Sequence, residues 1–276
     1  IAVEKFSSGI ESLDFNDSNK SARTINAFVE ANTNRMIKDF IKPQMLNSDT
    51  RLVLVNAIYF KGTWKYQFNK LATRNGDFHI NETVKNRVEY MTIKKCFDYG
   101  ELDGLDAKAL EIKYADSNFS FLIILPNSRS GLLALEGKIE NYKLNDITSQ
   151  MRLTTCSVTI PKFKAEFEID LESVLKTLGM AEMFDTKSAN FTDLLEANEQ
   201  LYVSDVIHKA IIEVNEEGSE AAAATEKKVK VCCSGRRIPN YTIFRVDHAF
   251  LFHIIDKESN TIIFSGRGEN LKTQTN

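Results

Sequence analysis

The sequence is poor in the residues that would tie it to a metal, a membrane or a cross-linked fold. Its four cysteines, Cys96, Cys156, Cys232 and Cys233, show no C-x-x-C or zinc-ligand spacing, and we expect all four to be free thiols. Its apolar runs, such as 119–126, are far shorter than the roughly 20 residues that cross a bilayer. The formal net charge of −3 is too small to indicate a nucleic-acid partner. We therefore expect no metal or other cofactor, no nucleic acid and no membrane.

Chain-breaking residues are also scarce. Four prolines and twelve glycines are spread over 276 residues, and neither a Pro/Ser-rich linker nor an internal repeat divides the chain. A hydrophobic fraction of 43% is enough for a sizeable core. Helical spacing predicts a helix over 21–41, and the apolar run 51–59 predicts a strand buried on both faces. Because strands and helices mix without regular βαβ alternation, we expect the α+β class and a single domain over 1–276.

The other predicted elements are short and bounded by turn residues. Helices are expected at 131–140 and at 169–178, the second closed by Gly179. Strands are expected at 108–114, 118–125, 153–162, 201–214, 241–255 and 261–264.

Motifs of known enzyme classes are absent. The sequence contains no G-x-S-x-G, P-loop, H-E-x-x-H or G-x-G-x-x-G pattern. Its four histidines, His79, His208, His248 and His253, lack the spacing of a catalytic triad or a metal site, and we expect His208 to be a hydrogen-bonded structural residue. We therefore do not expect an enzyme.

The segment 214–239 is unlike the rest of the chain. It holds no aromatic residue and almost no large apolar side chain, and it is long for a connection between the strands predicted at 201–214 and 241–255. Composition alone favours a flexible polar loop, with a marginal Ala-rich helix at 216–228. Loops of this length in compact domains are usually functional or disordered.

Motifs in and around this segment resemble those of one family. Residues 209–225 read KAIIEVNEEGSEAAAAT, which resembles the hinge of the inhibitory serpins. Residues 56–64 read NAIYFKGTW and are similar to that family's signature strand and turn, with Phe68 and Thr73 at its spacing. On these motifs the chain is identified as a member of the serpin family, although Ala249 stands where the family usually has Pro. Further similar segments, in family order, are 25–30 (with Phe28 where Trp is usual), 125–126, 160–163, 178–180, 189–191, Phe250 and 264–267.

The resemblance implies the serpin fold, with a large, mostly antiparallel β-sheet able to accept the reactive loop as an extra strand, smaller sheets and surrounding helices. It also implies a monomeric inhibitor of serine-type endopeptidases that traps its target as a suicide substrate. The protease cuts the loop and forms an acyl-enzyme, and insertion of the hinge then stalls deacylation. A non-inhibitory binding or carrier serpin, or one merely cleaved as a substrate, is the alternative. A complete serpin would carry a further N-terminal part, about a hundred residues long, so we expect this chain to be N-terminally incomplete.

The residue types of the implied hinge suit insertion as a strand. Side chains alternate between the two faces of a strand, and on the family's pattern four small or β-branched residues point inward. Glu220 falls on the solvent face, and Gly218 supplies a flexible pivot. Lys227 falls on the inward face, where it either stalls insertion or extends its ammonium out to solvent at the end of the sheet. The implied hinge consists of Glu216, Glu217, Gly218, Ser219, Glu220, Ala221, Ala222, Ala223, Ala224 and Thr225, of which Ser219, Ala221, Ala223 and Thr225 point inward.

Two counts place the bond that the target protease cuts. Counting the usual hinge length forward from Glu216 gives Cys232–Cys233, whereas counting back from Pro239 points to Gly235–Arg236, with Arg237 next to it. We favour Cys232–Cys233, because hinge length governs whether trapping outruns hydrolysis. If Arg236 or Arg237 is the specificity residue the target is trypsin-like, and otherwise it is a protease that accepts small or apolar side chains.

Six N-x-S/T triplets favour an extracellular, glycosylated protein. An intracellular protein stays open, because the expected N-terminal part is absent. The triplets begin at Asn16, Asn19, Asn81, Asn118, Asn190 and Asn240.

Overall fold

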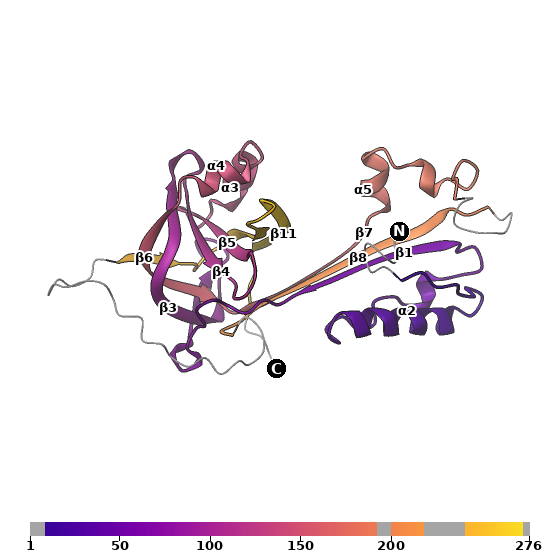
Figure 1. Cartoon of the computed structure of the whole chain (residues 1–276), viewed down its shortest axis with the longest axis horizontal. Coiled ribbons are helices and arrows are strands. Elements are labelled where there is room, and N and C mark those ends of the chain that lie inside the picture. Colours follow the sequence, from indigo (N-terminus) through magenta and orange to yellow (C-terminus); the bar gives the residue numbers. More distant parts are fainter. Residues whose placement is uncertain (1–8, 192–199, 218–240, 273–276) are drawn as a thin grey trace. The chain divides into compact units, whose positions relative to one another are not determined.

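The computed structural model describes residues 9–191, 200–217 and 241–272 (Figure 1). These residues belong to two compact units. The first unit comprises Ile1–Phe60 and Glu166–Ile212, and the second comprises Lys61–Ala165 and Glu213–Asn276.

The first unit is built on a sheet with the strand order β1-β8-β7 among the described residues. Strand β1 (Leu52–Phe60) runs parallel to β8 (Val203–Val214), from the pair Leu52↔Val203 to the pair Phe60↔Ile212, and β7 (Phe163–Asp170) lies on the other side of β8. Helix α2 (Ser18–Asn32) buries Ala22, Ile25 and Val29 in one cluster with Ile207 and Ile211 of β8. Helix α5 (Glu172–Thr177) and the 3₁₀ turns Pro43–Met45 and Glu182–Phe184 complete this unit.

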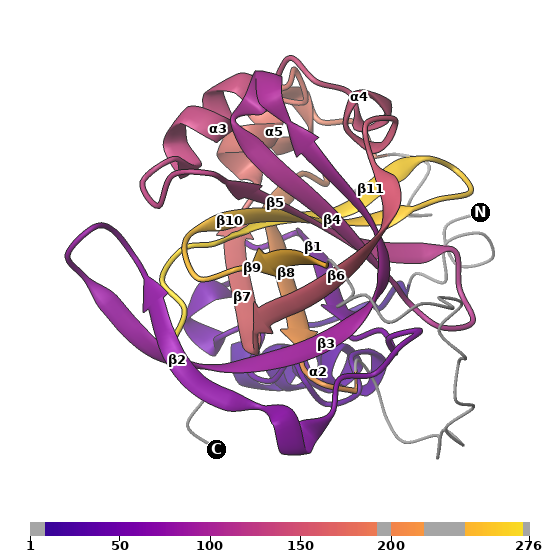
Figure 2. The same ribbon diagram turned by 90° about the vertical axis from the view of Figure 1, so that its left-hand side faces the viewer.

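The second unit contains an eight-stranded sheet among the described residues. Its order is β11-β10-β5-β4-β3-β6-β9, with β2 also paired to β3, and every one of these pairs is antiparallel except β6–β9. Figure 2 shows the long strand β3 running alongside β2, β4 and β6. The strands are β2 (Arg74–His79), β3 (Lys85–Leu102), β4 (Ala107–Lys113), β5 (Phe119–Pro126), β6 (Arg152–Pro161), β9 (Thr242–Arg245), β10 (Phe250–Asp256) and β11 (Thr261–Gly268).

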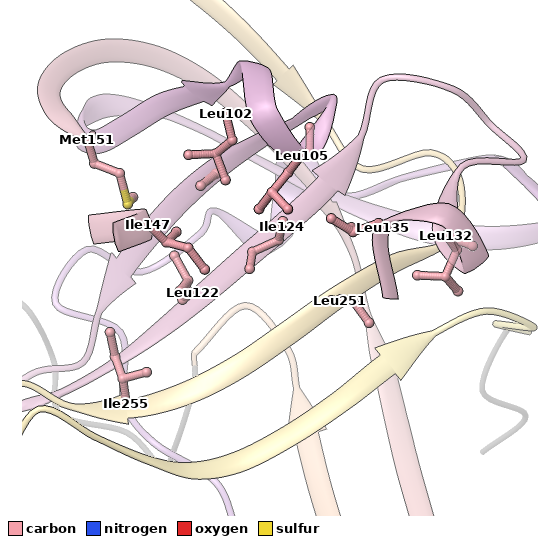
Figure 3. Packing of buried hydrophobic residues seen from close by; sticks show 13 residues of the cluster. Leu102, Leu105, Leu122, Ile124, Leu132, Leu135, Ile147, Met151, Leu251 and Ile255 are labelled. Atoms are coloured by element: carbon pink, nitrogen blue, oxygen red, sulfur yellow. The ribbon is translucent and has the colours of Figure 1, made fainter. Parts of the chain in front are cut away.

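Helices α3 (Leu132–Ile139) and α4 (Leu144–Thr148) cover one part of this sheet. Their apolar side chains close a buried cluster with β4, β5 and β10, shown in Figure 3. The labelled members are Leu102, Leu105, Leu122, Ile124, Leu132, Leu135, Ile147, Met151, Leu251 and Ile255.

The structure confirms the α+β class and corrects three of the predicted elements. The helix predicted to reach residue 41 ends at Asn32, because Asn34 and Arg35 adopt left-handed φ values of 50° and 60° that an α-helix cannot contain. The predicted helix over 169–178 begins only at Glu172, because 163–170 form strand β7. The predicted strand 241–255 is two strands, β9 and β10.

The prediction that β1 is buried on both faces was wrong. Leu54, Val55 and Ile58 are between 37% and 39% exposed. Among the described residues β1 is an edge strand, and β8 is its one partner strand. An apolar run shows that a strand is suited to burial, but it does not reveal which elements pack against each face.

Candidate functional site at the base of the predicted loop

Strand β8 ends at Val214, where the predicted loop begins. Of the predicted hinge, the structure places Glu216 and Glu217. The hinge residues 218–225, and the candidate bond residues Cys232, Cys233, Gly235, Arg236 and Arg237, lie outside the described residues. The candidate site is therefore the base of the loop, residues 213–217, together with the side chains that contact it.

Glu216 is a buried carboxylate held from three sides. Glu216 is only 5% exposed. Thr73 Oγ1 donates a hydrogen bond to Glu216 Oε1 at 2.6 Å, and Lys162 Nζ lies 3.3 Å from the same oxygen. The backbone is held as well, because the amide of Phe68 donates to the carbonyl of Glu216 at 2.9 Å. The side chain and the main chain of Glu216, the first residue of the predicted hinge, are thus both fixed.

The charge state of Glu216 follows from these partners. Burial by itself raises the pKa of a carboxyl group, because it disfavours the charged form. Hydrogen bonds from Thr73 and from the Glu216 backbone amide, together with the positive charge of Lys162, outweigh that effect and hold the pKa of Glu216 below its usual range. Glu216 is therefore ionised at neutral pH, although its side chain is almost fully buried.

Trp64 forms the apolar wall beside this carboxylate. It is 2% exposed, stacks on Tyr114 with ring centroids 4.6 Å apart, and meets Phe68 edge to face at 6.2 Å. Its indole Nε1 donates to the carbonyl of Asn215 at 2.7 Å, and its backbone amide donates to the carbonyl of Glu217 at 3.2 Å. One tryptophan therefore fixes the residues on both sides of Glu216.

Gly62, two residues before Trp64, is required by the same packing. A Cβ atom at this position would lie 2.5 Å from the ring of Tyr114, which is closer than any real side chain contact. The close approach explains why the sequence G-T-W follows β1, since only glycine lets the chain pass Tyr114 and turn Trp64 inward.

One turn explains the spacing of Phe68 and Thr73. These residues flank a 3₁₀ turn over Lys70–Ala72, which Asn69 caps by accepting a hydrogen bond from the amide of Leu71 at 2.9 Å. The turn brings the Phe68 amide and the Thr73 hydroxyl to the same residue, Glu216.

The flanking residues of the base are held by ion pairs nearer the surface. Lys70 pairs with Glu217, whose side chain is 34% exposed, and this hydrogen-bonded partner raises the pKa of Lys70. On the other side, Lys61 lies 3.3 Å from Glu213, and Glu213 also accepts a hydrogen bond from Asn215 Nδ2 at 2.8 Å. Exposed ion pairs contribute little to stability, and this applies to the Lys70–Glu217 pair, in which the lysine side chain is 63% exposed.

A second polar contact joins the two parallel strands of the first unit. His208 Nδ1 lies 3.1 Å from Asn56 Oδ1, and these two residues are directly opposite each other in the β1–β8 ladder. His208 is thus a hydrogen-bonded structural residue, as the sequence predicts. The contact adds a side-chain link to the backbone ladder between β1 and β8.

Sequence reasoning identified Trp64, Phe68 and Thr73 by resemblance but missed three other residues of the site. Tyr114 and Lys70 carry no motif of their own. Lys162 stands in the segment 160–163 that resembles the family, yet nothing in that pattern says that its ammonium reaches Glu216. A lysine directly after the strand-ending Pro161 was the one available signal, and it is a weak one.

Other candidate chemical groups are structural. His248 lies 2.9 Å from Asp247 Oδ1 and 2.8 Å from the carbonyl of Pro126, and burial lowers the pKa of His253 to about 4. In the described residues no group of three or more His, Cys, Asp and Glu side chains is arranged to hold a metal ion. Cys96 and Cys156 are free thiols, whereas Cys232 and Cys233 lie outside the described residues. Across the described ranges, no helix is long and apolar enough to cross a membrane.

Comparison with known proteins assigns the family. The family model described as Serpin (serine protease inhibitor) matches residues 2–271. The chain belongs to the serpin family. Serpin B3 of Homo sapiens is 39% identical to it over 272 residues, which cover 96% of this chain and 68% of that protein. Alaserpin of Manduca sexta is 41% identical over 225 residues, which cover 81% of this chain and 57% of that protein.

Solved structures agree with this assignment. The crystal structure of Serpin48 from the insect Tenebrio molitor matches this serpin with a TM-score of 0.84 and 35% identity, covering 98% of this chain and 70% of that one. The predicted serpin fold is therefore confirmed. Among the described residues the large, mostly antiparallel sheet is the eight-stranded one, and β1, β8 and β7 form the smaller sheet. This serpin spans between 57% and 68% of the length of the two curated relatives above.

Proposed function

We propose that this serpin acts as an inhibitor of serine-type endopeptidases that works by suicide-substrate trapping. The target protease cuts the loop 214–239 and forms an acyl-enzyme. The freed hinge then inserts as a new strand and carries the protease with it, so that deacylation loses its aligned oxyanion hole. In this proposal the serpin itself is not an enzyme.

One observation supports the proposal best. A buried, ionised Glu216, held by polar contacts, stands two residues ahead of the segment 218–225, in which every residue except Glu220 is small. A permanent structural anchor would need no such run, whereas a strand that must enter a packed sheet needs small side chains on its inward face. The base is thus held firmly by the contacts of Glu216, and the segment after it has the small side chains that insertion needs.

The pairing of β1 and β8 indicates where the strand would enter. The two strands are parallel and lie side by side along the whole of β1. The chain that leaves β8 at Val214 returns antiparallel to β8 when it folds back. A returning strand placed between β1 and β8 would be antiparallel to both, and antiparallel pairing is slightly more stable per residue.

The partner in this proposal is a serine protease. It is trypsin-like if Arg236 or Arg237 is the specificity residue, and a protease that accepts small or apolar residues if Cys232 is. We place the encounter outside the cell, on the strength of the N-x-S/T triplets. Lys227 favours the alternative of a serpin that is cleaved as a substrate, because its inward parity would bury an ammonium.

The test uses the complete protein and a panel of trypsin, chymotrypsin, elastase and subtilisin. We expect a denaturant-resistant complex with at least one protease, and mass spectrometry of the released C-terminal peptide locates the cut bond. Cleaved serpin together with fully active protease, for every enzyme of the panel, would refute inhibition and support the substrate alternative.

A matched pair of variants tests the insertion step. Ala223→Arg places a charge on the inward face and Ala222→Arg places it on the outward face. Burying an unpaired charge costs several kcal/mol, so Ala223→Arg should divert most encounters to simple cleavage while Ala222→Arg keeps complex formation. Equal behaviour of the two variants would contradict insertion with this parity.

A further inference from the structure

The turn between β2 and β3 carries one of the six triplets in an ordered conformation. Strands β2 and β3 are paired up to His79↔Lys85. The turn beyond this pair closes through a backbone hydrogen bond from the amide of Ile80 to the carbonyl of Val84 at 2.9 Å. Its tip is the sequence Asn81-Glu82-Thr83, and all three of these residues are exposed.

The side chain of Asn81 is oriented by the residue that completes its triplet. Asn81 Oδ1 accepts hydrogen bonds from the amide of Thr83 at 2.9 Å, from the hydroxyl of Thr83 at 3.1 Å and from the amide of Val84 at 2.8 Å. These three contacts all use the oxygen of the carboxamide. The hydrogen bonds that shape the turn therefore do not involve the carboxamide nitrogen Nδ2 of Asn81.

In the other triplets that the structure describes in full, either the hydroxyl is buried or the Nδ2 atom of the asparagine already donates a hydrogen bond. Ser120 is completely buried in β5, and Asn118 Nδ2 already donates to Glu258 Oε2 at 2.6 Å. Ser21 is 2% exposed and donates to a backbone carbonyl of Asp14, so the triplet at Asn19 has its hydroxyl in the core. In the triplet at Asn16, the Nδ2 atom donates to the carboxylate of Asp14 at 2.9 Å.

We propose that Asn81 is an acceptor for an N-linked glycan. The donor is an oligosaccharide carried on a lipid diphosphate. Asn81 Nδ2 forms a bond to the anomeric carbon of the sugar, the bond from that carbon to the diphosphate oxygen breaks, and the lipid diphosphate leaves with the electron pair. The amide gives up one proton to a base of the transferring enzyme.

The surroundings of Asn81 tolerate such a group. A glycan is bulky and hydrated, so it is compatible only with a surface position. Besides the triplet itself, the neighbouring Val84 is 47% exposed, and a sugar chain would shield this apolar side chain from other proteins. The modification leaves Oδ1 unchanged, so the hydrogen bonds that close the turn are retained.

This inference rests on the proposed extracellular role, and a dedicated variant set tests it. The complete protein is produced in eukaryotic cells as wild type, Asn81→Asp, Thr83→Ala, Thr83→Ser and Asn118→Asp. The carboxylate introduced by Asn81→Asp keeps an oxygen in the place of Oδ1 and with it the turn, but it has no amide nitrogen. Peptides containing position 81 are analysed by mass spectrometry before and after enzymatic removal of N-glycans.

We expect a glycan on the position-81 peptide of the wild type, Thr83→Ser and Asn118→Asp proteins, and none on that peptide in Asn81→Asp and Thr83→Ala. An unmodified position-81 peptide in the wild-type protein would overturn the inference. The protease panel is run on the same preparations, because trapping of a protease does not depend on the sugar. Failure of the inhibitory function and absence of the glycan are therefore separately observable.

Discussion

At the scale of single residues, the hydroxyl of Thr73 is expected to stabilise the base of the loop. It donates to the buried carboxylate of Glu216 at 2.6 Å. A hydrogen bond to a charged group contributes roughly 1.5–3 kcal/mol, so we expect Thr73→Val to destabilise the native protein by about that amount. Chemical denaturation of the complete protein measures the change.

The conservative variant Thr73→Ser is the control for this prediction, because it keeps the hydroxyl and loses one methyl group. It should remain within about 1 kcal/mol of the wild type. Equal losses in both variants would show that packing of the methyl group, rather than the hydrogen bond, is what matters at this position.

The ionisation of Glu216 predicts a dependence of stability on pH. Its pKa lies below the ordinary value of 4.5, so the folded state favours the charged form more than the unfolded chain does. The stabilisation from this group is therefore complete above about pH 4.5 and is lost as the pH falls through the lowered pKa. Unfolding of the wild type and of Glu216→Gln, measured between about pH 3 and 6, should converge at the acid end. A gap of constant size would contradict the assignment.

The sequence alone predicted only part of the site at the base of the loop. The resemblance singled out Trp64, Phe68 and Thr73, since each belongs to a recognisable run of sequence. It gave no reason why they occur together. That reason is Glu216, whose carboxylate, carbonyl and neighbouring carbonyls bind all three. Lys162, which lies between β6 and β7, supplies the balancing charge. Contacts between segments so far apart in the chain leave no periodic pattern in the sequence.

At the scale of secondary-structure elements, the proposed insertion requires the hydrogen bonds between β1 and β8 to break. The contact between Asn56 and His208 crosses this ladder. Its loss in Asn56→Ala should weaken the ladder by about 0.5–1.5 kcal/mol, which corresponds to a roughly 2- to 10-fold faster uptake of a synthetic peptide of sequence 216–228. A fluorescent label on the peptide measures the rate with the complete protein.

Lys209→Ala is the matched control for the ladder. Lys209 lies on the same strand, but its ammonium contacts Glu168 of β7 at 3.1 Å. It therefore acts on the opposite edge of β8. Acceleration of peptide uptake by Lys209→Ala as large as that by Asn56→Ala would mean that the peptide does not enter between β1 and β8.

Sequence patterns predicted the elements well where many of the side chains are buried. The paired strands β4 and β5, helix α3 and strand β8 lie within a few residues of their expected positions. They failed where a local backbone conformation decides the outcome. Asn34 and Arg35 end α2 in the middle of an apolar spacing that continues to Ile41, and the alternation of 163–170 is too polar to distinguish an exposed strand from a connection.

At the scale of the whole molecule, the proposed mechanism predicts that cleavage of the loop makes the protein more resistant to heat. In the intact chain β1 and β8 share one ladder, and an inserted hinge would replace it with two. Each additional kcal/mol of stability raises Tm by roughly 2–4 °C for a domain of this size. Calorimetry of the complete protein before and after cleavage within 231–237 should therefore show a higher Tm after the cut.

The variant Ala223→Arg separates insertion from simple relief of loop strain. If the gain in Tm comes from the new strand, cleaved Ala223→Arg should show little of it, and cleaved Ala222→Arg should show all of it. A fall in Tm on cleavage of the wild type, or an equal gain in the two variants, would be incompatible with insertion.

Trp64 gives the molecule a built-in optical signal. It is the one tryptophan among the 276 residues, and its indole nitrogen, its stacked ring face and its backbone amide all take part in the base of the loop. Indole emission depends on hydrogen bonding and on burial, so movement of Asn215 away from the ring would change the emission wavelength and intensity. In this chain, the proposed opening of the hinge can thus be followed in real time without any attached dye.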